Sequence, residues 1–240
     1  MQLKTNIIVI GTIKYGDTSL IARCFTEHLG YQSYLLKGIL TNRKTGLKKA
    51  IFQPFSILEA VVYHHPQKQL HHIREAQLTA SGHVQQPDVV KQTLTLFLAE
   101  VLQEVLQEEA GPNNELYTFL STSIQWLEHS EYAANFHLKF LLAMTRFMGF
   151  YPSAQTTEST YFEIDSASFV EYKPQGEYLE GKALFCFKKL LGTNFDELHT
   201  LQIEKTVKKE LLNKILCYYS VHLQHFGTPK SLHILQTVFS

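Results

Sequence analysis

The hydrophobic repeat of this chain changes once, near residue 80, and this change most constrains the fold. Before it, short runs rich in β-branched and aromatic residues alternate with turns that contain Gly16, Gly30 and Gly38. After Ser81 and Gly82, apolar residues recur at every third or fourth position, as they do on one face of a helix. We therefore expect an α+β protein with two domains, of residues 1–80 and 81–240.

The first domain contains five runs with the character of strands. These are Thr5–Lys14, Thr18–Thr26, Tyr31–Leu36, Ile51–Tyr63 and His72–Leu78. A five-stranded, partly open barrel of the oligonucleotide-binding (OB) type explains them most simply. Closure hides the strand edges, and such barrels present a strand face and its loops to nucleic acid. Pro54 inside the fourth run predicts an edge strand or a bulge there.

The second domain is predicted to be helical, with one small hairpin inserted. A helix begins at Pro87–Asp88 and runs to Glu108, and Asn113 or Asn114 caps the next. Further helices are expected over Ala133–Gly149, Tyr178–Leu191, Glu204–Gln224 and Lys230–Phe239, and a hairpin pairs Tyr161–Ile164 with Phe169–Tyr172.

The formal net charge of zero conceals an uneven distribution. Residues 1–80 carry ten Lys and Arg against four Asp and Glu, a charge of +6 (10 − 4). The remaining 12 bases face 18 acids, which gives −6. This division favours a nucleic-acid-binding face on the first domain and a different role for the second.

The loop between the third and fourth runs concentrates the positive charge and contains no acid. A phosphate chain suits such a loop because it tolerates imprecise placement, although a solvated basic loop is the alternative. Tyrosines of the barrel would offer stacking surfaces for bases, but a tyrosine in a strand more often packs against its neighbours. We expect DNA contacts from Lys37, Arg43, Lys44, Lys48 and Lys49, with Lys14 and Arg23 on the barrel face and stacking from Tyr15, Tyr31 or Tyr34.

Metal and enzymatic chemistry find little support. The histidines His64, His65, His71 and His72 flank a turn, but adjacent residues of a strand point to opposite faces, so an incomplete site results. The alternative is a polar hairpin tip that gains protons in mild acid. No phosphate-binding loop, nucleophile elbow or zinc-protease motif occurs in the sequence. We expect no catalytic activity and no cofactor.

The compartment is predicted from the cysteines and the N-terminus. Cys24, Cys186 and Cys217 lie far apart and form no C-x-x-C pair, which suits a reducing compartment. The first apolar run is too short for a signal sequence or a membrane span. We expect a cytoplasmic protein that does not associate with a membrane.

Several segments, in order along the chain, are similar to one known family. In the first domain they are Gly16–Ser19, Phe25–Thr26, Lys37–Gly38, Gln53–Glu59 and Ile73–Ala76. In the second they are Phe136–Leu138 with Leu141, Gly149–Pro152, and Tyr219, His222, Ser231–Leu232 and Leu235. On these residues the chain resembles the bacterial RecO family of recombination mediators.

The resemblance implies an OB domain that binds single- and double-stranded DNA, beside a helical domain that binds partners. Members anneal complementary strands coated with single-stranded-DNA-binding protein (SSB) and contact the acidic C-terminal tail of SSB. They work with RecR, and sometimes with RecF, to load the strand-exchange protein RecA. Many relatives carry a four-cysteine zinc site just beyond the G-x-x-P segment, but Ser153–Tyr161 contains no cysteine. Metal is therefore not expected here.

Two cations on the third predicted helix are candidates for contact with the SSB tail. Lys139 and Arg146 lie seven residues apart, hence on nearly the same side, among apolar residues that would form a groove for an acidic peptide. The alternative is that both are solvated cations on an ordinary core helix. Two other functions stay open for the whole chain: an adaptor whose basic barrel docks an acidic protein surface, and an OB-type RNA-binding protein.

Overall fold

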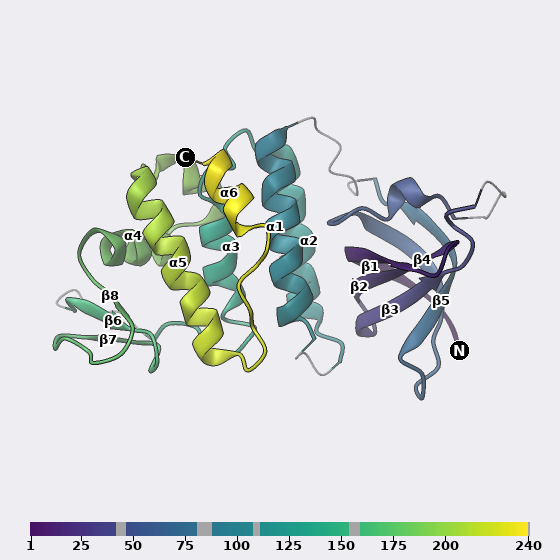
Figure 1. Cartoon of the computed structure of the whole chain (residues 1–240), viewed down its shortest axis with the longest axis horizontal. Helices are drawn as coiled ribbons and strands as arrows, with labels where there is room; N and C mark the ends of the chain where they lie inside the picture. The colour runs from purple at the N-terminus through teal and green to yellow at the C-terminus, as the bar shows by residue number, and fades with distance from the viewer. Residues whose placement is uncertain (42–46, 81–87, 108–110, 154–158, 240) are drawn as a thin grey trace. The chain divides into compact units, whose positions relative to one another are not determined.

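The computed structural model describes residues 1–41, 47–80, 88–107, 111–153 and 159–239. The chain divides into two compact units, Met1–His129 and Ser130–Ser240. The first unit holds a β-barrel and two helices, and the second holds helices and a small sheet (Figure 1). The predicted α+β fold, with a five-stranded OB-type barrel before a helical part, is confirmed. The predicted domain boundary after residue 80 falls where a described segment stops, and it stays a prediction.

The barrel closes in the strand order β1-β2-β3-β5-β4. All neighbouring strands are antiparallel except β3 and β5, whose parallel pairing of Ser33 with Leu70 completes the closure. Alternate residues such as Ile7, Val9 and Tyr34 fill the interior. The strands are β1 (Gln2–Tyr15), β2 (Ser19–Thr26), β3 (Gly30–Leu36), β4 (Ile57–Tyr63) and β5 (Leu70–Leu78).

The fourth strand is shorter than the sequence pattern suggested. A 3-10 turn, η1 (Lys49–Ile51), and a bend precede it, and Phe55 has a φ of 67° in the left-handed region. Pro54 therefore lies in a turn before β4, so the predicted edge or bulge at Pro54 is wrong. The apolar run misled because Phe52 and Phe55 are buried although they lie outside any strand.

Helices α1 (Val89–Val105) and α2 (Asn114–His129) complete the first unit. The Asp88 carboxylate accepts the N–H of Val90 at 2.8 Å, which confirms the predicted helix start. Asn113 is the cap of α2, because its Oδ1 accepts the N–H of Leu116 at 3.0 Å. α1 packs against β1, and the buried Lys91 ties it to α2.

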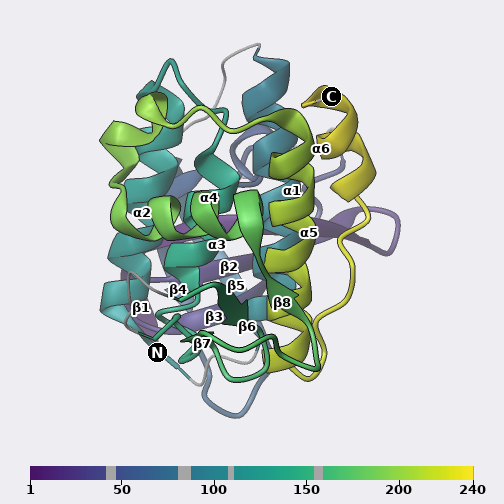
Figure 2. The same cartoon turned by 90° about the vertical axis from the view of Figure 1, so that its left-hand side faces the viewer.

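In the second unit, α3 (Phe136–Met144), α4 (Gly181–Gly192) and α5 (Lys205–His222) pack against one another (Figure 2). α3 is buried on nearly every side, and the Tyr219 hydroxyl donates to the carbonyl oxygen of Leu141 at 2.7 Å. α3 is shorter than predicted because turns follow Met144 up to Gly149, which has a φ of 82°. The shorter elements η2 (Phe195–Thr200) and α6 (Leu232–Val238) follow α4 and α5.

The predicted hairpin is confirmed and gains a third strand. β6 (Tyr161–Glu163) pairs with β7 (Ser168–Val170) and with β8 (Tyr178–Leu179), which the sequence pattern had assigned to the next helix. Phe162 is buried at the centre of aromatic rings that include Phe187, with ring centroids 4.6 Å apart. Throughout the described segments, the helices are too short or too polar to cross a membrane.

Candidate functional sites

Two of the predicted DNA-binding lysines lie at the same end of β1 and β3, the two strands that flank β2. Lys14 near the end of β1 pairs with Leu20 of β2, which pairs in turn with Leu36 of β3, and Lys37 follows directly. The loop after β3 is fastened to the β1–β2 turn by a hydrogen bond of 3.0 Å from the Leu40 N–H to the Thr18 carbonyl. Lys14 and Lys37 are both exposed, so this end of the sheet presents two cations about two strand spacings apart.

Lys48 and Lys49 are exposed on an anchored segment. They stand at the start of η1, and Leu47 before it, Ile51 within it and the buried Phe52 after it pack against the barrel core. The backbone is thus held by apolar contacts while the two ammonium groups face solvent. Arg43 and Lys44, predicted for the same loop, lie outside the described residues.

Ion pairing separates these lysines from two other cations of the barrel, Lys4 and Arg74. Lys4 pairs with Glu59 at 2.8 Å, and Arg74 pairs with Glu75 at 3.1 Å. Within the described part of the chain, no carboxylate forms an ion pair with Lys14, Lys37, Lys48 or Lys49. These four cations are therefore available to an external anion.

Arg23 has a different environment. Its Nη1 donates to Oε1 of Gln103 at 3.3 Å, so the half-buried guanidinium lies where α1 meets the barrel. Gly11 makes room for this contact, because a Cβ there would stand 2.9 Å from Nε2 of Gln103. Arg23 thus has a partner within the protein, unlike the four lysines, which form no ion pair among the described residues.

The three tyrosines proposed for base stacking are unequal. Tyr34 is fully buried in the barrel core, and burial raises the pKa of Tyr31 to about 12. Tyr15, beside Lys14, is 52% exposed, whereas Tyr31 is partly buried, so Tyr15 is the most exposed of the three. Stacking from this surface would therefore rest on Tyr15.

The four histidines of the β4–β5 turn alternate in burial. His71 is buried and its ring lies 4.3 Å from that of His64, whereas His65 and His72 are exposed. Burial lowers the pKa of His71, and the neighbouring histidines lower it further. Such a cluster is a packed pair with two solvated neighbours, as expected of adjacent positions on a strand.

Lys139 and Arg146 have different partners, although they lie near enough for the charge of Arg146 to lower the pKa of Lys139. The Nζ of Lys139 donates to the carbonyl oxygen of Leu190 at 3.0 Å, at the C-terminal end of α4, and burial lowers the pKa of this lysine. Arg146 is exposed and its guanidinium lies 4.5 Å from the centre of the Tyr151 ring. Lys139 therefore satisfies helix carbonyls, and neither residue lines the pocket described next.

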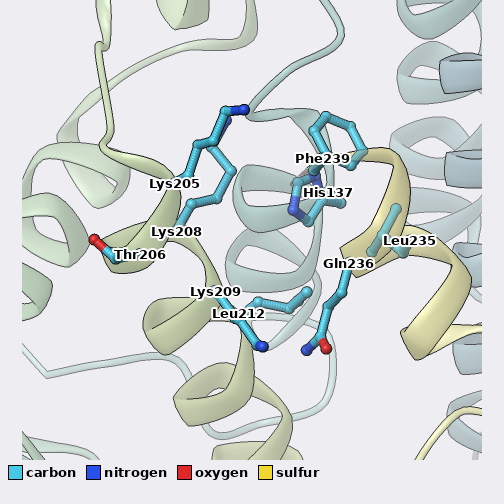
Figure 3. Close-up of a pocket in the computed structure, with 9 residues that line it drawn as sticks. All are labelled: His137, Lys205, Thr206, Lys208, Lys209, Leu212, Leu235, Gln236 and Phe239. Carbon is cyan, nitrogen blue, oxygen red and sulfur yellow. The ribbon is translucent and has the colours of Figure 1, made fainter.

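A pocket of about 190 Å³ opens between α5, α6 and α3 (Figure 3). Three lysines of α5 lie on one side of it, α6 contributes the other side, and His137 of α3 lies between them. No acidic side chain is among the lining residues, which are His137, Lys205, Thr206, Lys208, Lys209, Leu212, Leu235, Gln236 and Phe239. A basic rim over an apolar floor fits an acidic peptide that carries an apolar side chain.

Two groups in this pocket, Lys208 and His137, have lowered pKa values. Burial lowers the pKa of Lys208, whose Nζ donates to the carbonyl oxygen of Ala134 at 3.2 Å. Burial, and then the charge of Lys208, lowers the pKa of His137 to about 3. His137 is 1% exposed, and its Nδ1 has no hydrogen-bond partner among the described residues. The imidazole is thus neutral near pH 7, with one unsatisfied nitrogen.

The sequence patterns did not identify this pocket, because its residues come from three distant segments. One signal was present: Lys205, Lys208 and Lys209 stand at positions i, i+3 and i+4 of a helix and so share one face. The apolar partners Leu235 and Phe239 join that face only through the tertiary fold.

Comparisons with known proteins cover nearly all of the chain. The family model described as "Recombination protein O N terminal" matches residues 1–81, and "Recombination protein O C terminal" matches residues 86–233. The chain is 38% identical over 240 residues to a DNA repair protein RecO of Flavobacterium psychrophilum, and the match covers 100% of both chains. Proteins of the same name from Christiangramia forsetii and Flavobacterium johnsoniae are 34% and 36% identical, also over 100% of both chains.

Proposed function

Because this chain belongs to the RecO family and so has a role in DNA repair and recombination, we propose that its barrel binds single- and double-stranded DNA and anneals complementary strands. One observation carries the proposal: exposed lysines at one end of β1, β3 and on η1 have no carboxylate partner among the described residues, whereas Lys4 and Arg74 on the same barrel do. Phosphate contacts of this kind are insensitive to base sequence.

The proposed mechanism needs charge neutralisation and no bond-breaking chemistry. Each ammonium group that replaces condensed counterions on a phosphate releases them, which favours binding. Two neutralised strands then repel each other less, so base pairing proceeds while both stay on one protein surface. Lys14, Lys37, Lys48 and Lys49 supply the cations, and Tyr15 supplies a stacking face.

We further propose that the chain helps to load the strand-exchange protein onto SSB-coated DNA together with RecR and, as in some members of the family, with RecF. For the acidic SSB tail we propose the pocket of Figure 3 in preference to the surface of Lys139 and Arg146. The exposed Lys205 and Lys209 would meet carboxylates, and Leu212 and Leu235 an apolar side chain. In support, Lys139 already donates to two carbonyl oxygens.

Annealing of complementary DNA oligonucleotides without ATP tests the DNA proposal. Replacement of Lys48 and Lys49 by Glu is expected to slow annealing strongly, because two phosphate-binding cations become repulsive anions. Lys68→Glu is the matched control, since Lys68 is an equally exposed lysine on the β4–β5 turn. Annealing that survives the double reversal would instead support an adaptor with a basic barrel. Preference for RNA over DNA of the same sequence would indicate the RNA-binding alternative.

A separate binding assay tests the tail site. Lys205→Glu with Lys209→Glu is expected to abolish binding of an SSB-tail peptide and to spare DNA annealing. Arg146→Glu is the control at the other candidate surface, and Lys189→Glu is a single-reversal control at an exposed lysine of α4. Loss of peptide binding in Arg146→Glu alone would return the site to the surface of Lys139 and Arg146.

A further inference from the structure

We propose that α6 with Phe239 is a strap that fills the apolar side of the pocket and must lift before the aromatic side chain of a peptide enters. The proposal rests on the peptide-binding function proposed above and adds its regulation by the chain itself. The strap is defined here as residues 232–239, which follow α5 through the non-helical residues 223–231.

Phe239 already makes the contacts that an aromatic ligand would make. Its ring centroid lies 5.2 Å from that of His137 and 5.6 Å from the Nζ of Lys208. An ammonium group near an aromatic face is attracted to the ring quadrupole, more so where water is partly excluded. Figure 3 shows the Phe239 ring beside His137, on the side of the pocket that faces the α5 lysines. An incoming aromatic residue would therefore compete with Phe239 for the same partners.

The strap is weakly attached. α6 has seven residues, of which only Leu235 is buried, and Ser231 makes no side-chain capping hydrogen bond. A hydrogen bond of 3.1 Å from Gln236 Nε2 to Asn213 Oδ1 joins it to α5 and is exposed. Two helical turns are marginal by themselves in water, and segments with little buried apolar area open at low free-energy cost.

The closed arrangement also leaves His137 unsatisfied. Its buried Nδ1 has no hydrogen-bond partner in the described chain, and an unpaired buried polar atom is destabilising. When Phe239 leaves, this nitrogen becomes accessible to water or to a polar group of the peptide. The open state therefore recovers part of what the strap contacts lose.

The test uses the full chain and two labelled probes: a short acidic peptide that ends in Phe, and the same peptide ending in Ala. Phe239→Ala is expected to tighten binding of the Phe-ended peptide about fivefold, because a competitor is removed and more molecules are binding-competent. The Ala-ended peptide should show no such gain. Phe185→Ala is the matched control, since the exposed Phe185 has Lys189 4.6 Å from its ring centre and does not line the pocket.

Each outcome decides the proposal. Weaker or unchanged binding in Phe239→Ala overturns it, because Phe239 would then be part of the pocket floor or a bystander. If the Lys205 and Lys209 reversals abolish peptide binding while Phe239→Ala gives no gain in affinity, the peptide site is supported and the strap is overturned. Absence of binding by both wild type and Phe239→Ala overturns the two together.

Amide hydrogen exchange gives an independent measurement in the wild-type protein. Exchange in residues 232–239 is expected to accelerate several-fold when the Phe-ended peptide is saturating, since the strap has lifted. Unchanged or slower exchange overturns the strap. Phe239→Leu keeps apolar volume without the aromatic ring and is the second variant if Phe239→Ala unfolds; it should show a smaller gain in affinity.

Discussion

Arg23 on β2 donates a hydrogen bond to Gln103 on α1 across 3.3 Å, so an arginine at the barrel surface links the barrel to the helix beside it. We predict that Arg23→Ala lowers the free energy of unfolding by about 1 kcal/mol, because a charge-assisted but half-exposed hydrogen bond is lost. Urea unfolding measures this change, and Gln103→Ala completes a double-mutant cycle. DNA affinity should fall less than in the Lys48 and Lys49 reversals; an equal fall would make Arg23 a DNA contact.

Salt dependence counts the phosphates that the lysines contact. If Lys14, Lys37, Lys48 and Lys49 each neutralise one phosphate of a single strand, log K should fall with log salt at a slope of roughly −3. Reversal of Lys48 and Lys49 should reduce the slope to about half, whereas Lys68→Glu should leave it unchanged. A fluorescence titration at several salt concentrations gives the slope. A wild-type slope near zero would exclude an electrostatic interface.

Lys139 is predicted to stabilise the folded protein. Its ammonium group donates to the carbonyl oxygens of Leu190 and Leu191, which end α4 without other helical partners. Lys139→Met should keep the apolar packing and lower the free energy of unfolding by about 1–2 kcal/mol. Lys189→Met, at an exposed site in the last turn of α4, should change it by less than about 0.5 kcal/mol. Equal effects in the two variants would contradict a specific role for Lys139.

His137 should make stability depend on pH. Its pKa is about 3 in the folded chain and near 6.5 when unfolded, so between these values the unfolded state binds a proton that the folded state does not. Stability from this group is complete above pH 6.5 and is lost as pH falls towards 3. The loss should reach about 2 kcal/mol by pH 5. His137→Phe should remove this component in denaturant titrations at pH 7 and pH 5; parallel pH profiles would show that His137 does not titrate as proposed.

Much of the fold follows from local pattern. The alternation from Leu58 to Tyr63 in β4 and the three-and-four spacing in α1 each reflect one buried face, and the Asp88 and Asn113 caps mark where backbone N–H groups need partners. The pattern failed at Phe52 and Phe55, where buried apolar side chains come from a loop. Burial and strand geometry usually coincide in a sequence pattern, but they are physically separate.

The candidate sites were only partly predictable. Exposed lysines without an acid nearby in sequence, such as Lys48 and Lys49, can be recognised from composition because their environment is mostly solvent. Lys139 resembled them, but its partners lie 51 and 52 residues away, and only the packing of α3 against α4 brings them together. The pocket brings together His137 and Phe239, which lie still farther apart in the sequence. Local charge therefore indicates a binding surface, whereas tertiary contacts decide which charges are free.

The pairing of β3 with β5 closes the barrel, and this closure would affect how copies of the protein behave when several bind one strand of DNA. A polyanion raises the local concentration of the proteins bound to it, and at high concentration proteins with unpaired edge strands tend to aggregate through these strands. Here every strand of the barrel has a hydrogen-bonded neighbour on both sides, and three residues of β3 pair with three of β5 at the seam. Neighbouring copies on a shared DNA molecule would thus contact one another through side chains. Their association should therefore stay reversible.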